Sequence, residues 1–524
     1  MRAVPRAEPR SRGRLASAAI VASATLGSSV LGFGREVVNA RFYGTSRELD
    51  TFIAATTIPT IVFGLFNGAL VSALVPLFTR WFGADDRDSA WRLASTILNV
   101  LALLLCGLSV LGWYLAPFYV PAIASGFSHD QAAAAVEMTR AIIPGVVTTS
   151  LAGAISALLN AQGRFTAAAL QGVAINIATI AMVVILAPHW GIEALVWGTL
   201  LGLIAQLLVQ LPALLMLGGY RPVLALDHPG LRELFAVIGP IVLGSLGGQA
   251  GIFLDRYFAS GLAVGAISGM NYAVKLTSFP QTVFAAALAT VLFPWLATEF
   301  ARANKGAVRR AVESSLQIVN VITIPATVGL IVIAGPLVRV LFERGAFNPQ
   351  ATLLTASLVP YAAVGLAAIA VNVVLSRCTF ACNAVWPTVA ISLGSVVLNV
   401  ALALALLPSL GARGLLLASS LSQLAQAVAL AFVVRGLIGS LGWRGVFWHA
   451  LRVGVAAGVM AAVIAYLEYV AEPRVTTLAQ DLLFVVVSLA LGGVVYVVVA
   501  RALGVREIDR VAQAIAAKFR AARA

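Results

Sequence analysis

Long apolar segments recur along the whole chain, and each is close to the length of about 20 residues that an α-helix needs to cross a bilayer. Short stretches rich in glycine, proline and charged residues separate them and predict about fourteen membrane-spanning helices. The predicted spans are 16–40, 51–79, 92–115, 136–161, 166–187, 192–217, 231–257, 267–298, 308–333, 351–376, 383–407, 411–435, 447–470 and 480–503. Since no stretch between them is long enough for a separate soluble domain, the expected fold class is an all-α polytopic membrane protein.

Similar residues at a constant offset indicate an internal repeat. A shift of 220 residues superposes the following pairs: Leu186 and Leu406, Pro188 and Pro408, Gly191 and Gly411, and Gln206 and Gln426. The common order and offset predict two pseudo-symmetric six-helix lobes with the same orientation in the membrane. The predicted organisation is a basic tail at 1–15, lobes at 16–217 and 218–436, two further spans within 437–505, and a basic tail at 506–524. Two such lobes around a central cleft are typical of a transporter.

Charged residues are few and unevenly placed. Hydrophobic residues make up 60% of the chain and charged residues 11%, whereas a soluble domain averages about 25% charged residues. The net charge of +14 does not indicate a nucleic-acid partner, because the basic residues are scattered over short loops. Lysine and arginine concentrate in alternate loops, which predicts that both termini are cytoplasmic. The tail from Arg506 onward is expected to lie as a basic amphipathic helix on anionic lipid.

Polar side chains inside the apolar segments are the main candidates for function. A charge in a spanning helix costs roughly 2.5–3.5 kcal/mol on insertion scales, so it usually faces a partner or a water-filled cavity. The candidates are Arg35, Glu36, Arg41 and Asp50 in the first half of the chain and Asp255, Arg256, Asn271 and Lys275 in the second. Each group falls in the first two spans of its own half, so the repeat predicts that both groups face the same cleft.

These residue types suit a phosphate-bearing ligand. Arginine can grip a phosphate through two parallel hydrogen bonds, and lysine can contact it as a point charge. Glu36 and Asp50 would hold the arginines when no anionic ligand is bound. Two alternatives stay open: Arg35 could mark a helix end and extend to the lipid headgroups, and Asp255 and Arg256 could form a pair at the membrane interface.

The sequence patterns of enzymes and metal sites are missing from the chain. Cys378 and Cys382 lie one helical turn apart with no histidine nearby, so we expect them to pack between helices rather than to bind a metal. The chain has no Walker loop, no His-Glu-x-x-His motif and no plausible Ser/His/Asp arrangement. The predicted outside loops are also short for a glycan polymerase or ligase. We therefore expect a transporter with neither catalytic activity nor a cofactor.

Several stretches of the chain are similar to one known family. They are SSVLGFGRE at 28–36, ARFYG at 40–44, LLNAQGRF at 158–165, YAVKLTSFP at 272–280 and FERGAF at 342–347. Together they resemble the MurJ/MviN family of the multidrug/oligosaccharidyl-lipid/polysaccharide exporter superfamily. The resemblance implies fourteen spans in the bacterial inner membrane. It also implies transport of lipid II, the undecaprenyl-pyrophosphate-linked peptidoglycan precursor, from the inner to the outer leaflet.

The resemblance also assigns substrate-binding residues. Arg35 matches the family's essential arginine, and Ser28 opens the same motif. Glu36 and Asp50 match its acidic positions, and Lys275 takes the place of a cavity arginine. The substrate headgroup would enter the cleft from the inner leaflet while its prenyl tail stays in lipid, and the lobes would rock to expose it outside.

The chain departs from the family at two positions. Ser29 stands where the motif has its first arginine, and the stretch near Phe63 is apolar where the family has a basic residue. Less cationic surface would then face a pyrophosphate. A flippase for another lipid-linked glycan, such as an exopolysaccharide or O-antigen repeat unit, is therefore the first alternative. A cation-coupled drug exporter is the second, although the candidate site is mainly basic.

Coupling and partners follow from the same reasoning. Transport could be coupled to the membrane potential or to a monovalent ion, since one elementary charge is worth roughly 2.3 kcal/mol per 100 mV. The expected partners are the lipid-linked glycan and membrane lipids. The machinery of cell-wall or polysaccharide synthesis is a further candidate partner.

Overall fold

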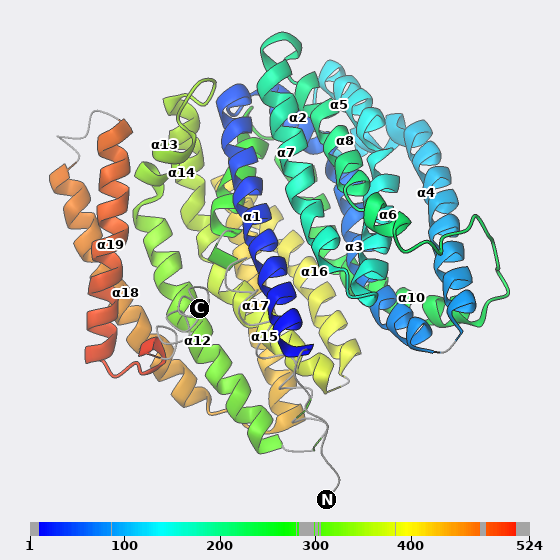
Figure 1. The fold of residues 1–524 in the computed structure, drawn as a ribbon. Coiled ribbons are helices and arrows are strands. Elements are labelled where there is room, and N and C mark those ends of the chain that lie inside the picture. Colours follow the sequence, from blue (N-terminus) through cyan, green and yellow to red (C-terminus); the bar gives the residue numbers. More distant parts are fainter. Residues whose placement is uncertain are drawn as a thin grey trace, which may run out of the picture. The chain divides into compact units, whose positions relative to one another are not determined.

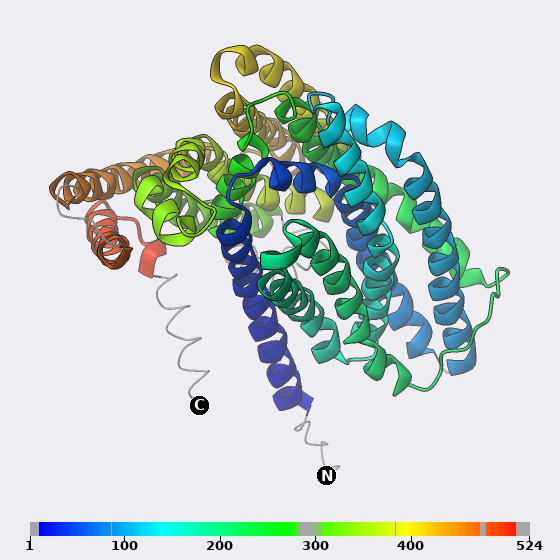
Figure 2. The ribbon, with the colours of Figure 1, turned by 90° about the horizontal axis from the view of Figure 1, so that it is seen from above.

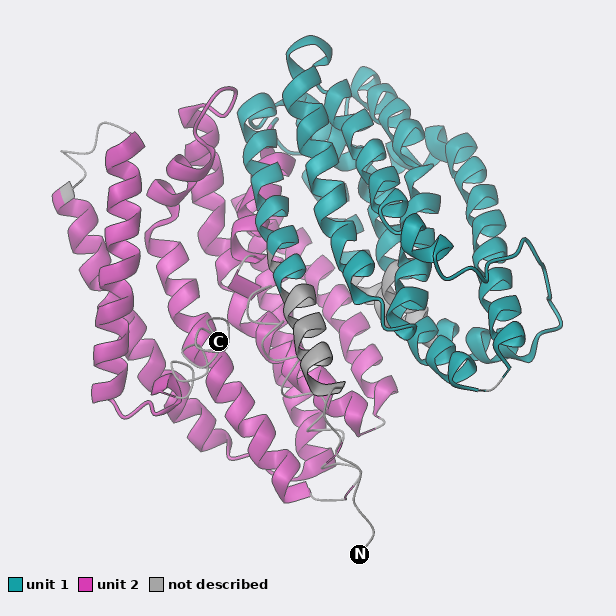
Figure 3. Cartoon of the chain, in the orientation of Figure 1, with its two compact units in different colours: residues 1–264 teal, residues 265–524 magenta. Residues whose placement is uncertain are grey.

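The computed structural model describes residues 10–84, 86–278, 305–382, 384–471 and 478–509, together with isolated positions between 280 and 302. These residues form α-helices joined by short loops (Figure 1), which confirms the predicted all-α class. The chain divides into two compact units, which consist of residues 1–264 and residues 265–524 (Figure 3). Most of the predicted span 267–298 and of the two basic tails lies outside the described residues.

The first unit contains the helices up to α10. Their bounds are α1 Arg10–Tyr43, α2 Arg47–Ala55, α3 Thr57–Gly83, α4 Arg87–Ile123, α5 His129–Ile142, α6 Gly145–Ala161, α7 Phe165–Trp190, α8 Glu193–Leu208, α9 Leu211–Leu215 and α10 Pro229–Ala259. Helix α1 packs along α7, and α7 packs against α8 (Figure 2). The repeat assigns α10 to the second lobe, but α10 packs against α3 and α4 and so falls in the first compact unit.

The second unit begins with helical residues 266–278. Its further helices are α12 Lys305–Val332, α13 Ala334–Phe342, α14 Pro349–Ala363, α15 Leu366–Ala381, α16 Val385–Leu410, α17 Ala412–Ile438, α18 Trp443–Ala471 and α19 Leu478–Ala502. Helix α12 packs against α15 and α18, α16 packs against α17, and α18 packs against α19.

Membrane-spanning segments follow the predicted ranges closely. Within the described residues, eleven helical stretches are long and apolar enough to cross a membrane. Helices α1 and α10, with 34 and 31 residues, also have spanning length. Large apolar side chains point outward from these helices, such as Phe118 at 71% exposure and Val110 at 69%. Such a surface is stable in hydrocarbon and not in water, as a multi-pass membrane protein requires.

The same turn occurs twice in the chain, where the repeat predicts it. Helix α7 ends at Gly191 with φ 54° and ψ −133°, and α16 ends at Gly411 with φ 54° and ψ −131°. A proline lies three residues before each glycine, at Pro188 and Pro408. Residues other than glycine rarely adopt a positive φ. The two glycines therefore allow the same turn in both places, from α7 to α8 and from α16 to α17.

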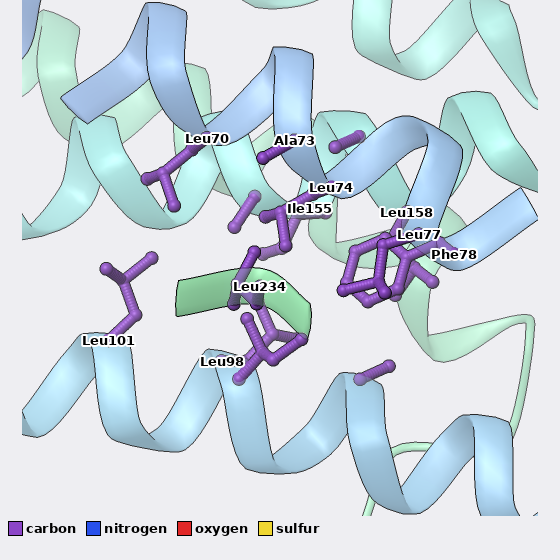
Figure 4. Packing of buried hydrophobic residues seen from close by; sticks show 14 of the residues in the cluster. Leu70, Ala73, Leu74, Leu77, Phe78, Leu98, Leu101, Ile155, Leu158 and Leu234 are labelled. Carbon is purple, nitrogen blue, oxygen red and sulfur yellow. The ribbon is translucent and has the colours of Figure 1, made fainter. Parts of the chain in front are cut away.

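The core of each unit is built where apolar faces of helices meet. In the first unit, α3, α4, α6 and α10 enclose a cluster of leucines and phenylalanines (Figure 4). Leu74, Phe78 and Leu158 in this cluster are almost fully buried. In the second unit, the ring of Tyr272 lies 5.0 Å from that of Phe342 and 5.4 Å from that of Phe347. These aromatic contacts attach the helical segment 266–278 to the FERGAF stretch at the end of α13.

Candidate functional site

Arg35 lies on α1 and is paired with its neighbour Glu36. An Arg35 Nη2–H donates to Oε1 of Glu36 at 3.2 Å, and the two side chains are 27% and 9% exposed. The guanidinium has five N–H donors, and Glu36 is its one hydrogen-bond partner within the described residues. Glu36 thus serves as a counter-ion, while other donors of Arg35 are available for an anionic ligand. Substrate binding by Arg35 and Glu36 stays a prediction.

Ser28 lies in the contact between α1 and α7. The Asn176 side chain donates from Nδ2 to the Ser28 carbonyl at 3.2 Å. A Cβ added at Gly172 would overlap the Ser28 hydroxyl, so the two helices approach closely because Gly172 has no side chain. The neighbouring Ser29 donates its hydroxyl to the Thr25 carbonyl of its own helix at 3.0 Å. The structure therefore places Ser28 where it sets the position of α1.

Arg41 lies near the end of α1 and is exposed. It belongs to the last turn, where a cation favours the negative end of the helix dipole. The sequence analysis missed Asn39, which lies one turn after Arg35, is 6% exposed, and has an Oδ1 atom without a hydrogen-bond partner in the described part of the chain. An unsatisfied buried amide oxygen is unusual, so Asn39 joins the candidates on this face of α1. Its spacing of four residues from Arg35 was the available signal.

Asp50 and Arg256 interact electrostatically although about two hundred residues separate them along the chain. Asp50 is 4% exposed on α2, a helix that Ser46 caps by accepting from the Leu49 N–H at 3.2 Å. Arg256, half-buried near the end of α10, interacts electrostatically with Asp255 and with Asp50. A buried charge is tolerated when such partners compensate its lost hydration. This cluster thus contains one cation and two carboxylates, all within the first compact unit.

Asn271 and Lys275 belong to the second unit. They lie four residues apart on one helical face, with Asn271 half-buried and Lys275 exposed. The segment that carries them is anchored through Tyr272, which is 1% exposed against Phe342 and Phe347. An exposed ammonium on a rigidly anchored helix can contact a phosphate as a point charge.

Cys378 and Cys382 pack within the second unit as expected. Cys378 is fully buried among apolar side chains of α12, α15 and α17, and Cys382 packs against the same cluster. Across the described residues, no group of three or more His, Cys, Asp or Glu side chains could hold a metal ion.

Comparison with known proteins identifies one family. The family described as "Lipid II flippase MurJ" matches residues 39–484. A lipid II flippase MurJ of Burkholderia cenocepacia is 32% identical over 76% of this chain and 79% of its own length. A probable lipid II flippase MurJ of Rhizobium meliloti is 32% identical, and the match covers 85% of this chain and 85% of the relative. A probable lipid II flippase MurJ of Vibrio cholerae is 29% identical, and the match covers 95% of this chain and 98% of the relative.

Solved structures share the fold. A lipid II flippase MurJ in an inward closed conformation matches with a TM-score of 0.78 and 22% identity, over 93% of this chain and 99% of that structure. An inward-facing multidrug transporter of the MATE family matches with a TM-score of 0.67 and 16% identity, over 81% and 98%. These likenesses confirm the predicted all-α membrane fold.

Proposed function

We propose, because this chain belongs to the lipid II flippase MurJ family, that it moves lipid II from the inner to the outer leaflet of the bacterial cytoplasmic membrane. The family match extends over most of the chain, and the relatives that carry this name align along most of their own length. The chain is a multi-pass inner-membrane transporter and not an enzyme. Peptidoglycan synthesis is the process that this transport serves.

The pairing of Arg35 with Glu36 is the observation that supports this proposal within the site. The pyrophosphate of lipid II is an anion, and a guanidinium binds phosphate through charge-assisted hydrogen bonds that are stronger than neutral ones. Arg35 has donors beyond the one that Glu36 accepts, so an incoming phosphate can add to the pair or replace Glu36. Glu36 then orients the arginine when no substrate is bound.

The cluster of Asp50, Asp255 and Arg256 also supports binding of an anionic headgroup. Arg256 interacts electrostatically with the carboxylates of Asp255 and Asp50, and an anionic headgroup could replace either interaction. Lys275 would supply a further point charge to the phosphate. We propose that alternating access carries the headgroup across the membrane while both chain termini stay in the cytoplasm.

The energy source is part of the proposal. Moving one elementary charge across the membrane is worth roughly 2.3 kcal/mol per 100 mV, so the membrane potential or one monovalent ion would be sufficient to bias the lobes. The enzymes that make or polymerise peptidoglycan are the expected partners, because they supply and consume the lipid-linked substrate.

The test is growth rescue in bacteria depleted of their own lipid II flippase. The wild-type chain should restore growth, and Arg35→Ala should abolish the rescue. Arg87→Ala is the matched control, because Arg87 is an exposed arginine with no ion pair in the described residues. A wild-type chain that reaches the membrane at normal levels and still fails to rescue would exclude lipid II as its cargo and favour another lipid-linked glycan.

A further inference from the structure

A small pocket opens where α18 meets α12 and the segment that follows α19. Its volume is about 260 Å³. The lining side chains that concern its chemistry are Gln317 from α12, Trp448, His449 and Arg452 from α18, and Arg506 and Glu507 from the segment after α19. None of these residues belongs to the predicted substrate site, and all of them lie in the second compact unit.

Glu507, the acidic residue of the lining, is paired with His449. His449 Nε2 lies 2.9 Å from Oε2 of Glu507, and the two side chains are only 9% and 12% exposed. Because an ionised carboxylate can only accept, the imidazole donates this hydrogen bond. Glu507 is therefore held against α18 by His449, and its charge is oriented toward the imidazole rather than toward an arginine.

The two arginines of the lining, in contrast, have no ion pair within the described residues. Arg452 Nη1 lies 3.9 Å from the place of a Cβ on Gly504, a residue with φ 77°. The absence of a side chain at Gly504 thus leaves room beside the guanidinium. Nearby Arg501 differs, because it donates twice to Oδ1 of Asp509, at 2.9 and 2.6 Å.

The position and size of the pocket restrict its ligand. Trp448 is 52% exposed near the start of α18, and exposed tryptophan side chains gather at the boundary between membrane and water. Pockets for drug-sized ligands usually measure about 300–1,000 Å³, so this one suits a smaller group. Basic pockets between membrane helices bind the phosphates of lipid headgroups.

We propose that this pocket binds a phosphate group through Arg452 and Arg506. The phosphate would belong either to the headgroup of an anionic phospholipid or to a small soluble phosphate compound. Two guanidinium groups can surround the phosphate oxygens, and the indole of Trp448 lines the same pocket. Since α12, α18 and the end of α19 meet here, the bound group would hold these elements together.

The experiment measures binding to the purified full chain in a phosphate-free sugar detergent. Native mass spectrometry follows retention of phosphatidylglycerol and of phosphatidylcholine, and thermal unfolding follows stabilisation by the same lipids and by inorganic phosphate. The wild-type chain should bind phosphatidylglycerol saturably and in preference to phosphatidylcholine. The double variant Arg452→Gln/Arg506→Gln should bind about tenfold more weakly or worse, as the loss of charge-assisted contacts predicts.

Arg444→Gln is the matched control, because Arg444 is an exposed arginine on the same helix that does not line the pocket. Binding that inorganic phosphate does not displace assigns the site to a lipid headgroup, and displacement without lipid preference assigns it to a soluble phosphate. If the double variant unfolds early, Arg506→Gln alone serves, since Arg506 is exposed and lies beyond α19. The proposal is overturned if no probe binds the wild-type chain saturably, or if the pocket variants bind like Arg444→Gln.

Discussion

Replacing Gly172 by alanine tests whether the contact between α1 and α7 positions the charged segment of α1. The new Cβ would overlap the Ser28 hydroxyl and lie 3.0 Å from the Ser28 Cβ. The contact cannot open easily at this point, because Asn176 holds the Ser28 carbonyl one turn further along α7. The helices would therefore separate along the stretch of α1 that leads to Arg35.

The expected magnitude follows from two opposing effects. Adding a methylene-sized group to a packed contact typically costs about 1–3 kcal/mol. Removing a glycine from a helix interior gains roughly 0.5–1 kcal/mol. From the midpoints of the two ranges, the net destabilisation should thus be about 1 kcal/mol. Ser28→Ala removes the overlapping hydroxyl but keeps the close Cβ, so the combined variant should recover about half of the loss.

Thermal unfolding in detergent measures the stability, and growth rescue measures transport. Gly107→Ala on α4 is the control, because nothing lies within 4 Å of a Cβ at that position. We expect Gly172→Ala to lower both the melting temperature and the rescue, and Ser28→Ala to restore part of both. Equal behaviour of Gly172→Ala and Gly107→Ala would refute the reasoning, as would purely additive effects of Gly172→Ala and Ser28→Ala.

Two further predictions concern the stability of the fold: one tests the ion pair between α13 and α19, and the other tests the glycines at the repeated turn. Asp481→Ala removes the carboxylate that accepts from Arg339 Nη1 at 3.1 Å and should destabilise the contact between α13 and α19 by about 1 kcal/mol. A double-mutant cycle with Arg339→Ala measures this coupling, and independent effects would contradict it. Gly191→Ala and Gly411→Ala should each cost about 1–3 kcal/mol through backbone strain at φ 54°. Gly394→Ala, at a helical position without close neighbours, should leave the melting temperature nearly unchanged.

Hydropathy predicted the spans well because membrane helices satisfy their backbone within one apolar segment. The predicted span 166–187 corresponds to α7, Phe165–Trp190, and 411–435 corresponds to α17, Ala412–Ile438. The same signal could not reveal breaks within a span. The predicted helix 136–161 consists of α5 and α6, which meet around Pro144. The residues at such a break stay apolar, so the hydrophobic pattern continues through it.

The site was less accessible from the sequence than the fold. The cost of a charge in a membrane helix identified Arg35, Asp50 and Arg256 as candidates, because apolar segments make such charges conspicuous. The Glu36 partner of Arg35 was also predicted, because the two residues are neighbours in the sequence, but the interaction of Asp50 with Arg256 was not. The electrostatic interaction of Asp50 with Arg256 joins residues about two hundred positions apart, and no local pattern encodes such a pairing.

Both charged clusters of the first unit combine an arginine with at least one carboxylate. Arg35 is held by Glu36, and Arg256 interacts with Asp255 and Asp50. Each cation thus has a carboxylate of its own, which lowers the cost of keeping it away from bulk water. A phosphate headgroup that bound at these arginines, as proposed, would exchange one anion for another, so its net affinity would be the difference between two strong interactions. The net affinity for the headgroup would therefore be low. A transporter requires a low net affinity, because a headgroup bound too tightly on one side of the membrane would not be released on the other.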